Sequence, residues 1–145
     1  MNIYLDLTLV VVRLLLGVLM VVHGYQLLIS KADRGMLIPM MRSLGVPRAA
    51  FEMAAILSFF GGIFMMLGLL TRLVSFFFII FMASTIVLYI TKLTVTMPMG
   101  AFDQYYKKSR GYIKGWELDT MIIAVSLILL MLGGGAYSID RLLNI

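Results

Sequence analysis

The residues of this sequence best suited to proton chemistry lie near one end of each of four long apolar segments. If consecutive segments cross a membrane in opposite directions, helical rise puts most of these residues within roughly 10 Å of one membrane boundary. Histidine titrates near neutral pH, so His23 and Glu52 are candidates for exchanging a proton, with a hydrogen bond from Tyr89 or Lys92. The predicted buried network comprises His23, Gln26, Glu52, Tyr89, Lys92 and Asp119. It would suit a polar ligand or a quinone headgroup.

A structural role explains part of the same layer. Glu52, Glu117 and Asp119 fall in first helical turns, where the helix dipole favours acidic side chains. The ammonium group of Lys92 can reach the lipid headgroups by snorkelling. The structural interpretation is favoured for Glu117 and Lys92. For His23 and Glu52 a buried network is favoured, because exposing such side chains to lipid at that depth is costly.

A second, smaller polar set is predicted at the opposite membrane face. It comprises Arg13, Arg72, Tyr137 and Asp140, with Asp6 and Arg141 at similar depth. Arg13 lies inside the first apolar segment, and two interpretations stay open for it: a snorkelling side chain or a buried ion pair. His23 lies about 80° around the same helix from Arg13 and near the other surface, so the two residues do not form one site.

The residue inventory predicts no metal site. The chain has one histidine and no cysteine, which excludes disulfides, thiolate chemistry, iron–sulfur clusters and bis-histidine haem ligation by this chain alone. Its 13 methionines are scattered along the sequence, which is typical of flexible packing residues. We therefore expect no cofactor held within the chain, apart from a possible quinone.

Composition predicts an integral membrane protein. Of the 145 residues, 62% are hydrophobic, and the mean hydropathy is +1.04, which is typical of a chain that crosses the bilayer several times. We expect one all-α transmembrane domain over residues 1–145, folded as a four-helix antiparallel bundle. The expected helices span about 8–29, 48–70, 73–95 and 116–137. Between the first two, Gly35 and Pro39 are expected to break any continuous helix.

Small residues recur at helical spacing on three of these segments. Gly61, Met65, Gly68 and Arg72 follow one another at i, i+4, i+7 and i+11, and such a stripe lets a neighbouring helix approach closely. Comparable faces occur on the first and last segments. The predicted helix-packing glycines are Gly17, Gly24, Gly61, Gly68 and Gly133.

The distribution of basic residues predicts the orientation. Twelve lysines and arginines lie mostly in two connectors, residues 30–50 and 96–115, which the positive-inside tendency places in the cytoplasm with both termini outside. We expect a multi-pass protein of the cell membrane whose basic loops contact anionic lipid. The tyrosines among these basic residues suit the membrane interface, so no nucleic-acid partner is predicted.

The sequence resembles the DoxX family of small four-helix membrane proteins over nearly its whole length. The most specific part of the resemblance is Glu52 followed by Gly61-Gly62 and Leu67-Gly68-Leu69-Leu70-Thr71-Arg72. Further matching segments are Arg13 with Gly17 and His23-Gly24, Leu44-Gly45-Val46-Pro47, and Gly135-Ala136-Tyr137-Ser138-Ile139-Asp140. The family takes its name from a membrane component linked to terminal oxidase in archaea. Its DoxD-type relatives belong to thiosulfate:quinone oxidoreductase, and others associate with redox-stress enzymes or act in membrane-protein assembly.

The resemblance implies two alternative functions and assigns no catalytic residue. The first is an accessory or structural subunit of a larger membrane redox complex, in contact with lipids and other membrane subunits. The second is a quinone-reactive subunit of a membrane oxidoreductase, such as a thiosulfate:quinone type of enzyme, that receives its electrons from a partner.

Overall fold

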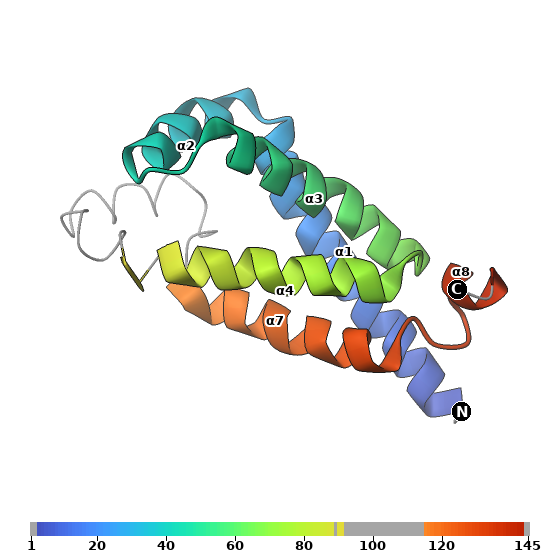
Figure 1. Ribbon diagram of the computed structural model, residues 1–145. Coiled ribbons are helices and arrows are strands. Elements are labelled where there is room, and N and C mark those ends of the chain that lie inside the picture. Colours follow the sequence, from blue (N-terminus) through green and yellow to red (C-terminus); the bar gives the residue numbers. More distant parts are fainter. Residues whose placement is uncertain (1–2, 89, 92–114, 144–145) are drawn as a thin grey trace.

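The computed structural model describes residues 3–88, 90–91 and 115–143. This part of the chain is all-α, as predicted (Figure 1). Its helices are α1 (Ile3–Leu28), α2 (Lys31–Ser43), α3 (Arg48–Leu67), α4 (Thr71–Leu88), α7 (Gly115–Leu132) and α8 (Ile139–Leu142). Among the described residues α1, α3 and α4 are long and apolar enough to cross a membrane, and α7 contains a shorter apolar stretch, Leu118–Leu132.

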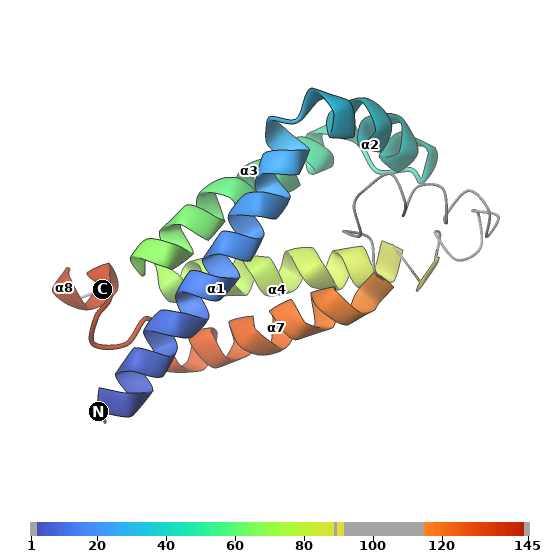
Figure 2. The ribbon, with the colours of Figure 1, turned by 180° about the vertical axis from the view of Figure 1, so that it is seen from behind.

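The long helices are arranged as two pairs. α1 packs mainly on α3, and α4 packs mainly on α7. Figures 1 and 2 show that the pairs meet at the end of the molecule that contains α8 and the start of α1, and diverge toward the end that contains α2. A closed four-helix antiparallel bundle stays a prediction.

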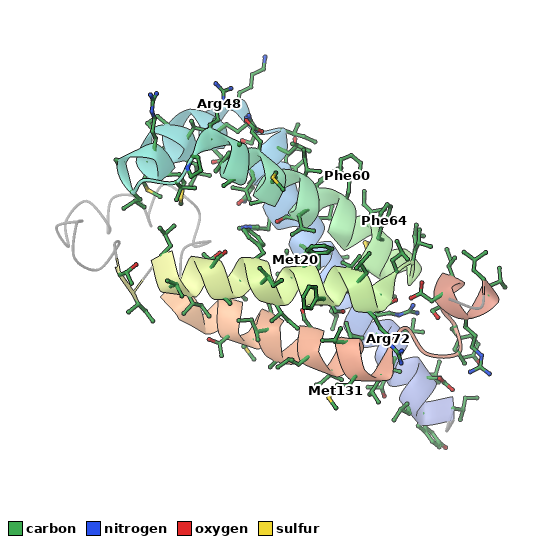
Figure 3. All side chains as sticks on the ribbon, in the orientation of Figure 1. Met20, Arg48, Phe60, Phe64, Arg72 and Met131 are labelled. Atoms are coloured by element: carbon green, nitrogen blue, oxygen red, sulfur yellow. The ribbon has the colours of Figure 1, made fainter. Side chains whose placement is uncertain are left out.

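Buried apolar side chains from both pairs fill the region where they meet. Met20, Met65, Phe78 and Leu129 are fully buried there, one from each of α1, α3, α4 and α7 (Figure 3 labels Met20). In contrast, many large apolar side chains on the outer faces are exposed, among them Phe60, Phe64 and Met131. This surface suits a hydrocarbon environment.

The connector after α1 forms a helix, contrary to the expectation that Gly35 and Pro39 would interrupt it. α2 includes both residues and is capped by the Ser30 hydroxyl, which accepts a hydrogen bond from the Asp33 N–H. Burial outweighs the poor helix propensity: α2 packs Leu37, Ile38 and Met41 against a buried cluster of Leu27, Phe51 and Ala55 at the ends of α1 and α3. Pro39 itself is exposed.

Two of the predicted packing glycines end helices. Gly68 and Gly133 have φ angles of 68° and 74°, a left-handed conformation that glycine adopts without steric cost. Gly133 therefore ends α7 at Leu132, five residues before the expected end at 137. The first helix also differs from expectation, because α1 begins at Ile3.

The other predicted packing glycines lie at helix contacts. A Cβ atom at Gly17 would lie 2.7 Å from the carbonyl oxygen of Gly62, and one at Gly24 would overlap the backbone of Phe59. A Cβ at Gly61 would lie 2.8 Å from the ring of Phe78 in α4. The close approach of α1 and α3 therefore depends on residues without a side chain.

Gly24→Ala should destabilise the protein, because the new methyl group has only the Phe59 backbone to displace. Overpacking of this kind costs about 1–3 kcal/mol. The matched control is Gly35→Ala, since nothing lies within 4 Å of a Cβ there and the better helix propensity of alanine should stabilise α2 by about 0.5–1 kcal/mol. Thermal unfolding of both variants in detergent, followed by circular dichroism, measures the difference. Equal midpoints would contradict a tight α1–α3 contact.

Candidate functional site: polar clusters at the two ends of the helices

At the α2 end, Glu52 pairs with an arginine of the connector. Both guanidinium Nη atoms of Arg34 donate to the Glu52 carboxylate, Nη1 to Oε2 at 3.1 Å and Nη2 to Oε1. Nη1 also donates to the carbonyl oxygens of Leu27 at 2.8 Å and Leu28 at 3.4 Å. The last carbonyl groups of a helix have no intrahelical partner. Arg34 therefore provides hydrogen bonds to the carbonyl groups at the end of α1 while it also binds Glu52 of α3.

Charge reinforces this junction. The side chains of Arg34 and Glu52 are 21% and 30% exposed, and the Arg48 Nε lies 3.7 Å from the Glu52 carboxylate. The hydrogen bond to Glu52 raises the pKa of Arg34 above its ordinary value, so this arginine stays charged at any physiological pH. The Arg34 guanidinium also lies 5.9 Å from the centre of the Phe51 ring, within the range of a cation–π contact.

His23 lies apart from this junction. Its ring packs 6.3 Å from the Phe81 ring of α4, at an interplanar angle of 48°. Gly24 contacts Phe59, and Glu52 precedes Phe59 by seven residues, which is about 10 Å along α3. Accordingly, no hydrogen bond joins His23 to Glu52 among the residues that the structure describes.

The remaining members of the predicted network are placed separately. Gln26 and Asp119 are half-buried, and Tyr89 and Lys92 lie outside the described residues. Within the described ranges, the side chains of His23 and Asp119 make no hydrogen bond. A network that joins all six residues stays a prediction.

At the α8 end, Arg13 is buried inside the protein, with only 2% of its surface exposed. Its Nη2 donates to the carbonyl oxygen of Tyr137 at 2.9 Å. This arrangement differs from both interpretations of Arg13: the side chain does not snorkel, and no carboxylate in the described residues lies within ion-pair distance of it. The partner is a main-chain carbonyl.

Asp140 caps the start of α4. Its carboxylate accepts hydrogen bonds from the backbone N–H groups of Leu70, at 2.5 Å, and Thr71, at 2.8 Å, and its own N–H donates to the carbonyl of Gly68 at 3.0 Å. Free N–H groups at a helix start favour a carboxylate. Asp140 thereby fastens the segment after α7 to the α3–α4 turn.

Asp6 makes a comparable contact from α1. Its Oδ1 accepts a hydrogen bond from the Ala136 N–H at 2.9 Å, and the residue is 5% exposed. Arg72 is exposed, and its Nε would lie 3.3 Å from a Cβ at Gly133. The predicted set of Arg13, Arg72, Tyr137 and Asp140 thus gathers at one end of the molecule, although Tyr137 contributes its carbonyl group and exposes its side chain.

Sequence reasoning missed Arg34 and Thr71 as members of these clusters. For Arg34 a signal was present: an arginine shortly after an apolar helix can reach the free carbonyl groups at its end. For Thr71 no comparable signal exists, because its position depends on how the α7–α8 segment folds back. Among the described residues no group of three or more histidine and acidic side chains could hold a metal ion.

Comparison with known proteins gives one match. The sequence profile of the DoxX family matches residues 8–91, which contain most of α1 and all of α2, α3 and α4, and therefore both Arg13 and Glu52. No curated protein and no solved structure matches the chain.

Asp140→Ala should lower the free energy of unfolding by at least about 2 kcal/mol, because hydrogen bonds to a charged acceptor contribute about 1.5–3 kcal/mol each. Asp33→Ala is the control: it also removes an acid from a first helical turn, but it loses only a dipole interaction of about 0.3–1 kcal/mol. Chemical unfolding in mixed micelles measures both. Equal losses would show that Asp140 does not hold the α3–α4 turn.

Proposed function

This chain belongs to the DoxX family, and from that premise we propose that it is an integral membrane accessory or structural subunit of a larger membrane redox complex. The family and the three apolar helices fit a membrane protein. In this proposal the apolar stretch of α7 provides a fourth crossing, so that the chain forms a four-helix antiparallel bundle in the cell membrane. The connectors 30–50 and 96–115 face the cytoplasm, and the termini lie outside.

The observation that carries the proposal is the use of acidic side chains to join helix ends. Glu52 binds Arg34 and thereby the end of α1, Asp140 binds the start of α4, and Asp6 binds the segment after α7. A carboxylate held in this way stabilises a shape and is poorly placed to shuttle protons. This is what a scaffold subunit requires.

Exposed apolar faces suit the other requirement of a subunit, which is contact with lipid and neighbouring membrane proteins. Phe60 and Phe64 of α3 are 47% and 37% exposed, and Met131 of α7 is 78% exposed. Figure 3 shows all three at the outer surface of the helices. Helix association in lipid depends on packing of such faces and on hydrogen bonds.

One observation favours the second candidate, a quinone-reactive subunit of a membrane oxidoreductase. The side chains of His23 and Asp119 make no hydrogen bond within the part of the chain that the structure describes. Both are titratable, and an ionisable residue within a membrane helix is by default a functional-site hypothesis. In this alternative the two residues exchange protons with a quinone, while a partner subunit, for example one that oxidises thiosulfate, supplies the electrons.

Glu52→Gln and His23→Ala distinguish the two functions. Under the scaffold proposal Glu52→Gln weakens the contact with Arg34, so less complex is recovered, while quinone reduction per assembled complex is unchanged. His23→Ala leaves both the amount of complex and quinone reduction near the wild-type values. The measurement is affinity purification of the tagged full chain in mild detergent, followed by quantification of co-purifying subunits and of quinone reduction.

The opposite pattern would support the quinone-reactive subunit. If His23→Ala preserves the amount of complex but abolishes quinone reduction, the scaffold proposal is inadequate. Arg48→Gln is the control for the loss of a charge beside Glu52: because its side chain is 74% exposed and its Nε lies 3.7 Å from the carboxylate, it should change neither quantity measurably.

A further inference from the structure

Arg13 and Thr71 carry hydrogen-bonding groups that nothing in the described structure satisfies. The Nε and Nη1 atoms of Arg13 and the Oγ1 atom of Thr71 are buried and lack a partner among the described residues. The two residues are 2% and 0% exposed. Buried groups of this kind cost about 1–3 kcal/mol each when unpaired, so their presence calls for an explanation.

The two residues belong to one small region around Ser138. A Cβ at Gly68 would contact the Arg13 Nη1 and would lie 2.9 Å from the Ser138 Cβ. A Cβ at Gly134 would lie 2.5 Å from the same Ser138 atom and 2.9 Å from the Thr71 Oγ1. The unpaired groups on α1 and α4 therefore both lie near the Ser138 side chain.

This region contains buried donors that no acceptor of the described chain engages. Nε carries one N–H and Nη1 two, and the Thr71 hydroxyl adds an O–H. The nearby carboxylates are directed at backbone N–H groups, two at Asp140 and one at Asp6 Oδ1, and in the described structure neither accepts a hydrogen bond from the unpaired groups of Arg13 and Thr71. The Ser138 hydroxyl donates to the Gly135 carbonyl and accepts from the Arg141 N–H. The unpaired donors of Arg13 and Thr71 are therefore suited to hydrogen bonds with an oxygen acceptor from outside the chain.

Charge and surroundings narrow the class of that acceptor. The carboxylates of Asp6 and Asp140 lie in the same cluster and offset the charge of the buried Arg13, so a neutral oxygen suits the remaining donors. On the outer face of α1, Val11, Leu14 and Leu15 expose apolar side chains at the same depth as the buried Arg13, so a molecule that reaches this depth is one that is soluble in the membrane. We propose that Arg13 and Thr71 bind the carbonyl oxygen of a neutral membrane-soluble molecule, an ester of a lipid or a quinone.

This site is separate from the proposed scaffold function and from the His23 and Asp119 alternative. Arg13 precedes His23 by ten residues, which is about 15 Å along α1, and it faces the α8 end of the molecule. A carbonyl ligand at Arg13 would therefore bind whether or not the other polar layer carries out chemistry.

Thr71→Val tests the site with little risk to the fold, since it keeps the side-chain shape and removes a hydroxyl that has no partner in the described chain. The full chain is purified in mild detergent, and binding of two probes, ubiquinone-2 and dihexanoylphosphatidylcholine, is measured by equilibrium titration. We expect one probe to bind, which identifies the source of the carbonyl. The loss of one hydrogen bond should weaken its binding about 3- to 10-fold.

Two control variants make the result specific. Thr71→Ser keeps the hydroxyl and should bind the probe like the wild type. Ser126→Ala removes another buried, unpaired hydroxyl, on α7, and should leave binding unchanged. The proposal is overturned if neither probe binds, if Thr71→Val binds as tightly as Thr71→Ser, or if a high-resolution structure with the probe present shows only water at Arg13.

Discussion

The segment after α7 is fastened to the α3–α4 turn by Asp140, whose carboxylate accepts hydrogen bonds from the backbone of Leu70 and Thr71 and whose N–H donates to the Gly68 carbonyl at the end of α3. Water and hydrocarbon give no comparable partner to a helix start that is covered by protein, so the first N–H groups of α4 depend on this carboxylate. The same contact positions the segment after α7, whose carbonyl at Tyr137 receives the Arg13 guanidinium. Removing Asp140 would therefore disturb α1 and α4 together.

The polar groups at helix ends need hydrogen-bond partners, and the two ends of the molecule provide them in different ways. At the α8 end, hydrogen bonds join α1, the α3–α4 turn and the segment after α7, and the two pairs meet (Figures 1 and 2). At the α2 end, Arg34 closes only the α1–α3 pair, because its partners are Glu52 and the last carbonyl groups of α1. The two pairs diverge toward this end (Figures 1 and 2).

Sequence reasoning predicted the features that depend on one helix at a time. Hydropathy located the apolar segments, whereas glycine spacing indicated a packing face on the first of them without naming α3, which contacts Gly17 and Gly24 in the structure. It failed where tertiary contacts override local preference: Pro39 is accommodated within α2 because neighbouring apolar residues pack, partly buried, against the ends of α1 and α3. It also grouped His23 with Glu52 by estimated depth alone, and depth contains no information about rotation around the helix or about a competing partner such as Arg34. The polar layer therefore stays a prediction, and depth alone does not give its contacts.

Arg13 shows why a buried charge needs more than one local partner. Its single hydrogen bond to the Tyr137 carbonyl leaves most of the guanidinium donors unmatched, and burying a cation with so few acceptors is costly. The acidic residues of the same cluster reduce that cost through charge, but their oxygens bind backbone N–H groups. The fold has thus used its own acceptors to close helix ends and has retained donors at a glycine-lined position. Such a surplus is better explained by an external acceptor than by packing, because an apolar side chain at position 13 would serve packing at less cost.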